Sequence, residues 1–186
     1  IDALVSLLPA LGFSGAQDSV VRLPSSSVST AGYHGPRTIL VVGVGTGWAD
    51  TDPLAVTTDD EAALGYDQTG LLRRAAGRAT RALAGTGSAI LALPTLSGQQ
   101  LAAVANGAAL GAYSWKATKN EDRPDQESSS KQSTPLKSIS IVSPLSDTPE
   151  GQETLAGALA LAEATSLTRD LVNEPPNRLT PEVFAE

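Results

Sequence analysis

Short apolar runs alternate with longer helical patterns along this chain, and that alternation constrains its fold more than any other feature. Runs typical of β-strands occur at Ser19–Leu23, Thr38–Val44, Ser88–Leu93 and Lys137–Val142. Helical patterns occur at Ile1–Leu11, Thr69–Leu83, Gln99–Ala112 and Glu150–Val172. Such alternation predicts an α/β fold, in which helices cover both faces of a sheet. The apolar run Thr38–Val44 is expected to be a central strand covered on both faces, and Ser88–Leu93 is expected to be another buried strand.

The composition excludes several classes of function. The chain has no cysteine, which excludes disulfides, thiolate metal sites and a cysteine nucleophile. The formal net charge of −7 makes a nucleic-acid partner unfavourable, because an acidic chain repels phosphate backbones. No apolar run approaches the roughly 20 residues of a membrane span, so no membrane partner is expected. Hydrophobic residues make up 41% of the chain, enough for a core.

The C-terminal stretch reads as a helix that stops, turns and starts again. Asn173–Pro176 ends the helix, because proline lacks an amide donor and disfavours the α region for the residue before it. Thr180 has the character of an N-cap and Pro181 of a first helical residue, so a second helix is expected from Glu182. The chain ends within that first turn, and we therefore expect it to be one piece of a longer protein.

Three motifs carry a family resemblance. Thr168–Glu182, TRDLVNEPPNRLTPE, resembles the hinge between the two domains of the leucyl aminopeptidase family, the hexameric two-metal cytosol aminopeptidases. Leu72–Leu83, LRRAAGRATRAL, is similar to an Ala-rich helix of that family. Asn106–Tyr113, NGAALGAY, is similar to its E-G-x-x-L-G-x-Y helix, with Asn106 in place of the usual Glu. The resemblance covers most of Val41–Glu186.

The resemblance implies a domain organisation. Residues 1–148 would form a macro-domain-like α/β domain, a three-layer sandwich with a mixed sheet and helices on both faces. The family usually opens with a further strand, so a missing N-terminal segment is expected. Residues 149–176 would form a long linker helix and hinge, and residues 177–186 would begin a catalytic domain.

The resemblance also implies a function, that of a metal-dependent leucyl aminopeptidase of the bacterial cytoplasm. In the family, two divalent metal ions, Zn²⁺ or Mn²⁺, are held by Asp, Glu and Lys side chains of the C-terminal domain. Those residues would lie beyond Glu186, so no catalytic, cofactor-binding or metal-binding residue is predicted in this chain. Its implied role is assembly and access to the active site. The implied partners are its own catalytic domain, neighbouring subunits of a homo-hexamer and peptide substrates.

The residues themselves offer few sites for chemistry, and each candidate has a simpler structural interpretation. Gly43–Gly47 follows a strand but lacks the dinucleotide fingerprint, so a glycine turn is favoured over a phosphate loop. Asp50–Glu61 is interpreted as a solvated acidic loop. His34 is the only histidine, and with no cysteine it cannot build a usual zinc site. Ser128–Lys131 spells S-x-x-K within the polar stretch Ala117–Pro135, which is expected to be an exposed excursion.

Two further features concern the helices. Arg169 and Asp170 are interpreted as polar caps of the hinge, with Arg169 bonding carbonyls at a helix end and Asp170 bonding amides in the turn. The helix Glu150–Val172 is apolar on more than one side, which predicts burial against a catalytic domain or another subunit. Two alternatives stay open: a macro-like module that binds ADP-ribose or a nucleotide, suggested by the Gly43–Gly47 turn, and a DNA-binding regulator. The DNA alternative is suggested by a helix that carries four arginines: Arg73, Arg74, Arg78 and Arg81.

Overall fold

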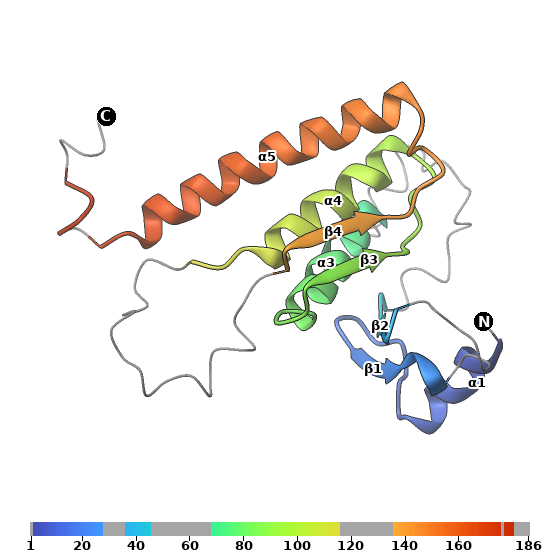
Figure 1. Ribbon diagram of the computed structural model, residues 1–186. Coiled ribbons are helices and arrows are strands. Elements are labelled where there is room, and N and C mark those ends of the chain that lie inside the picture. The colour runs from blue at the N-terminus through green and yellow to red at the C-terminus, as the bar shows by residue number, and fades with distance from the viewer. Residues whose placement is uncertain (1, 28–35, 46–67, 116–135, 176, 181–186) are drawn as a thin grey trace.

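The helices and strands follow the predicted order closely (Figure 1). The computed structural model describes residues 2–27, 36–45, 68–115, 136–175 and 177–180. His34, the acidic segment 50–61, the polar stretch 117–135 and the second helix expected from Glu182 lie outside these ranges. The elements are α1 (Asp2–Ala10), β1 (Val20–Pro24), the short 3-10 helix η1 (Ser25–Ser27), β2 (Thr38–Val42), α3 (Gln68–Ala82), β3 (Ser88–Leu91), α4 (Gly98–Ala112), β4 (Ser138–Ile141) and α5 (Pro149–Asn173).

The α/β class is confirmed, but the described strands form two small sheets where one mixed sheet was expected. Strands β1 and β2 pair antiparallel, with Val20 opposite Val42. Strands β3 and β4 pair in parallel, with Ser88 opposite Ser138. Within the described residues, β2 and β3 do not pair with each other, and both line an apolar cavity of about 700 Å³. The macro-domain-like sandwich therefore stays a prediction.

The described core lies between the β3–β4 sheet and the helices α3 and α4. Its centre is a cluster of buried residues from β3, α3 and α4, with partly buried residues of β2 and β4 packed against it. The other face of β3 is open, since the side chain of Ile90 is 63% exposed while its neighbours Ala89 and Leu91 are buried. Ser88–Leu93 was expected to be a buried strand, and its described part is buried on one face only. The described part of this sheet has helices packed on one face, which explains the alternating burial.

Helix α4 packs closely against α3 through glycines, as its small residues predicted. A Cβ atom added at Gly77 would lie 3.0 Å from the carbonyl oxygen of Gly107. A Cβ atom at Gly107 or Gly111 would overlap the backbone of α3 at Arg73 or Gly77. Side chains at these positions would therefore force the helices apart.

Helix α5 packs along α4 and then runs on to the hinge (Figure 1). It begins where predicted, because Thr148 caps it by accepting a hydrogen bond from the amide of Gly151 at 3.1 Å, and Pro149 follows at the first turn. Only Gly151 and Ala158 of this helix are buried. Large apolar side chains stay exposed on it, which agrees with the predicted apolar character of several sides: Leu155, Leu159, Leu161, Leu167 and Val172. Among the described helices, none is both long and apolar enough to span a membrane.

Candidate functional site

A cavity of about 480 Å³ opens where α3, α4 and α5 meet the turn that precedes β1. Charged side chains dominate its wall, and among the lining residues arginines outnumber acids by five to one. The single acid is Asp18, and Leu110 contributes apolar surface. The arginines are Arg73, Arg74, Arg78 and Arg81 of α3 and Arg169 of α5. More charged side chains line this cavity than line the apolar cavity between β2 and β3, which suits it to a charged ligand.

Helix geometry places three of these arginines on one stripe of α3. Arg74 and Arg78 are four residues apart, and Arg78 and Arg81 are three apart, so all three project from one face. The opposite face of the helix carries the buried residues Leu72, Ala76 and Ala79. This amphipathic pattern fixes the rotation of α3 and so turns the arginines toward the cavity.

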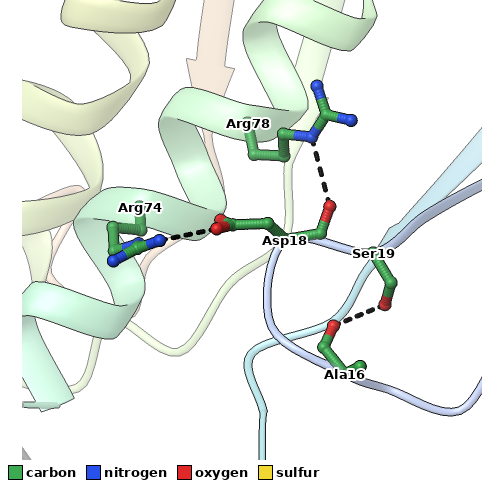
Figure 2. Close-up of polar contacts among 5 residues, drawn as sticks. All are labelled: Ala16, Asp18, Ser19, Arg74 and Arg78. Carbon is green, nitrogen blue, oxygen red and sulfur yellow. Dashed lines mark hydrogen bonds and ion pairs between the residues drawn. The ribbon is translucent and has the colours of Figure 1, made fainter.

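Asp18 reaches this stripe from a tight turn before β1 (Figure 2). Its carboxylate forms an ion pair with Arg74, with Oδ2 and Nη2 2.6 Å apart. Its carbonyl oxygen accepts a hydrogen bond from Nε of Arg78 at 3.2 Å. The backbone of Asp18 has a φ of 63°, a left-handed conformation that Asp tolerates better than most residues. The turn itself is held because the amide of Asp18 donates to the carbonyl of Gly43 at 3.2 Å.

The ion pair is too exposed to add much stability. The side chain of Arg74 is 60% exposed and that of Asp18 is 44% exposed. Exposed pairs of this kind contribute about 0–1 kcal/mol, because water screens them and both side chains lose freedom. The arrangement is therefore poorly explained as a device for stability alone.

A second cluster lies at the end of α4, where Tyr113 holds the C-terminal part of α5. The hydroxyl of Tyr113 donates to Oδ1 of Asp170 at 2.8 Å and accepts from Nδ2 of Asn173 at 3.1 Å. The guanidinium of Arg169 lies over the Tyr113 ring, 5.2 Å from its centroid, at cation–π distance. Nη1 of Arg169 also approaches the carbonyl oxygen of Leu110 at 3.4 Å. Arg169 therefore belongs to both the cavity and the hinge.

The environment of Tyr113 shifts its acidity. Desolvation and then the hydrogen bond to Asp170 raise the pKa of Tyr113 above its ordinary value of 10.0. The hydrogen bond from Asn173 and the charge of Arg169 act in the opposite direction. The tyrosine is therefore held as a neutral hydrogen-bonding group well beyond neutral pH.

The structure bears on three of the candidates considered from the sequence. The backbone amides of Gly43 and Gly45 donate to the carbonyls of Ser19 and Gly15, at 2.8 and 3.0 Å. A Cβ atom at Gly43 would overlap the turn at Ala16, so this glycine permits close packing of two loops and its amide is occupied. Arg169 does bond a helix-end carbonyl, although on α4. Asp170 differs from expectation, since its carboxylate accepts from a phenol where turn amides were predicted.

Sequence reasoning did not identify Asp18 or Tyr113. Asp18 lies 56 residues from Arg74, and Tyr113 lies 57 residues from Asp170, so no local pattern connects the partners. The sequence pointed to the cavity only indirectly, because four arginines lie on one helix with few acidic residues near them in sequence. Within the described ranges, no group of three or more His, Cys, Asp or Glu side chains is placed to hold a metal ion.

Comparison with known proteins finds relatives that align with nearly the whole of this chain. No protein-family model matches the chain. A probable cytosol aminopeptidase of Micrococcus luteus is 39% identical over 184 residues, covering 99% of this chain and 32% of that protein. The bottromycin maturation enzyme BotP, solved in complex with Mn, has a TM-score of 0.61 and 28% identity, covering 97% of this chain and 31% of BotP. A mutant of tomato leucine aminopeptidase shares the fold, with a TM-score of 0.60 and 24% identity over 98% and 30% of the two chains. The chain thus spans about a third of the length of the relatives it matches.

Proposed function

We propose that this chain is the N-terminal domain and hinge of a metal-dependent leucyl aminopeptidase. The reason is that the chain belongs to the cytosol aminopeptidase family by sequence over nearly its whole length. The intact enzyme would release N-terminal amino acids from peptides in the cytoplasm. One observation carries the proposal: 99% of this chain aligns with 32% of an aminopeptidase at 39% identity. The remaining two thirds of such a protein would hold the active site.

The catalytic metals would lie outside this chain. A two-metal site needs several oxygen or nitrogen ligands that converge within a few ångströms. The described residues do not fit that requirement, since they contain no cluster of three His, Cys, Asp or Glu side chains suited to a metal. BotP was solved in complex with Mn, which supports a divalent metal ion, Zn²⁺ or Mn²⁺, in the intact enzyme. The chain's own residues would therefore bind and orient neighbouring parts of the enzyme.

The Tyr113 cluster and α5 would serve this supporting role. Tyr113 ties the end of α5 to the end of α4 and so sets the direction in which the chain leaves the domain. Closer to the start of α5, exposed leucines such as Leu159 and Leu167 offer apolar surface for the catalytic domain or for a neighbouring subunit of a hexamer. The Tyr113 contacts and the exposed leucines of α5 together would fix the position of this domain relative to the active site.

A side-by-side activity assay tests the proposal. The purified 186-residue chain and the full-length protein are given leucine p-nitroanilide with added Mn²⁺, and N-acetyl-leucine p-nitroanilide serves as the control substrate. We expect the full-length protein to cleave only the substrate with a free α-amine and to lose activity with a chelator. We expect no cleavage by the chain. Activity of the 186-residue chain would contradict the proposal that the active site lies outside it. Inactivity of both proteins would contradict the peptidase assignment.

A further inference from the structure

We propose that the cavity between α3, α4 and α5 is a binding site for a small ligand that carries several phosphate groups. All the residues of this cavity belong to this chain, so the site does not depend on the aminopeptidase assignment. The charge of the cavity, its size and the position of Arg169 favour such a ligand.

The charge of the cavity is unbalanced. Five arginines and one aspartate line it, an excess of four positive charges in a chain whose net charge is −7. Among the described residues, Asp18 alone forms a side-chain ion pair with this set, and its partner is Arg74. Arg81, in the last turn of α3, has no acidic partner among the described residues. An anion from outside the cluster is the natural complement to this excess.

Stability does not explain why these charges are gathered. Like charges three or four residues apart on a helix cost roughly 0.2–0.5 kcal/mol per pair. The stripe Arg74, Arg78 and Arg81 contains two such spacings, and Arg169 adds a fourth guanidinium from another helix. A ligand that binds between the guanidiniums reverses this repulsion.

Phosphate suits the site better than a single carboxylate. Guanidinium groups form paired, charge-assisted hydrogen bonds to phosphate oxygens, and several phosphates are needed to balance an excess of four charges. The cavity volume of about 480 Å³ falls within the roughly 300–1,000 Å³ of small-molecule pockets. The walls come from three helices and a turn, which favours a compact ligand over an extended nucleic acid.

Arg169 connects the site to the hinge. Its guanidinium lines the cavity and also lies over the Tyr113 ring. Its contact with the carbonyl of Leu110 is long, at 3.4 Å, and is therefore a weak competitor for a phosphate oxygen. A bound phosphate would draw Arg169 away from Tyr113, which lies two residues before Trp115 in the chain.

Titration calorimetry of the full-length protein with sodium triphosphate tests the site. We expect saturable binding of one triphosphate per chain. Arg81→Gln should weaken it by about tenfold or more, the loss of one charge-assisted contact. Asp18→Asn removes the competing carboxylate and keeps a residue that tolerates the left-handed turn, so it should tighten binding roughly fivefold. Arg22→Gln, an exposed arginine of β1 outside the cavity, is the matched control and should change nothing.

Three results would overturn the proposal. The first is an absence of saturable binding, or an equal loss of binding in Arg22→Gln and Arg81→Gln. The second is equal affinity for citrate, which would show that phosphate is not the recognised group. The third is binding of duplex DNA without binding of triphosphate, which would indicate a nucleic-acid surface.

A fluorescence measurement tests the hinge connection separately. In a Trp48→Phe variant of the 186-residue chain, Trp115 is the only remaining tryptophan, since this chain contains two. Saturation with triphosphate should shift its emission, and Arg169→Gln should abolish the shift. An unchanged emission at saturating triphosphate would contradict the role given to Arg169.

Discussion

Replacing Gly107 with alanine should force α3 and α4 apart where Gly107 meets the backbone of Arg73. A Cβ atom at Gly107 would lie 2.8 Å from both the carbonyl carbon and the Cα atom of Arg73, and closer still to the carbonyl oxygen. Ordinary contacts between non-bonded carbon atoms are about 3.5–4.0 Å, so the helices would have to move apart by about 1 Å. Overpacking of this kind costs about 1–3 kcal/mol.

Helix propensity acts in the opposite direction, so a matched control is needed. Alanine favours a helix over glycine by about 0.5–1 kcal/mol. Gly157 on α5 provides the control, because a Cβ atom there would meet nothing within 4 Å. We expect Gly157→Ala to be more stable than the parent by about 0.5–1 kcal/mol and Gly107→Ala to be less stable by roughly 0.5–2 kcal/mol, as propensity offsets part of the overpacking.

Urea unfolding followed by circular dichroism measures both variants. With a slope of about 1–3 kcal/mol per molar urea, the two midpoints should differ by roughly 1 M. The difference between the variants cancels the propensity term and leaves the overpacking cost. Equal midpoints would refute the claim that glycine at position 107 is required by direct backbone contact between α3 and α4.

Three further predictions concern α5 and the hinge. Thr148→Ala removes the N-cap of α5 and should lower stability by about 1 kcal/mol in urea unfolding, whereas Thr168→Ala, inside the helix and away from its N-terminus, should have little effect. Because the pKa of Tyr113 is raised, its contribution to stability is fully present below pH 10 and is lost as the pH rises through the raised pKa. A tyrosinate absorbance component that titrates above pH 10 should therefore vanish in Tyr113→Phe. Its persistence in that variant would contradict the assignment to Tyr113. Leu159→Glu should reduce the mass of the full-length assembly in light scattering while Glu163→Gln does not, and equal masses would refute a role for this face in assembly.

The helices were predictable from the sequence because their signals are local. Leu72, Ala76 and Ala79 repeat at helical spacing, and α3 forms within one residue of the expected bounds. Thr148 and Pro149 mark the start of α5, and Pro175 accounts for its end after Asn173.

The sheet and the cavity were less predictable because they depend on long-range contacts. An apolar run such as Ser88–Leu93 fits either a strand covered on both faces or one covered on a single face, and the sequence cannot choose between them. Ile90 shows that a single face is covered here. The contacts of Asp18 with α3 depend on a left-handed turn packed against Gly43, and no periodicity indicates where such a turn will dock.

Metal content tests the central claim most directly. The 186-residue chain and the full-length protein are dialysed together against buffer containing Mn²⁺, and the metal bound per polypeptide is measured by inductively coupled plasma mass spectrometry. We predict about two tightly bound ions per full-length subunit and none in the chain, because the converging ligands of a two-metal site would lie in the remainder of the enzyme. Stoichiometric Mn²⁺ in the 186-residue chain, or none in either protein, would contradict the account.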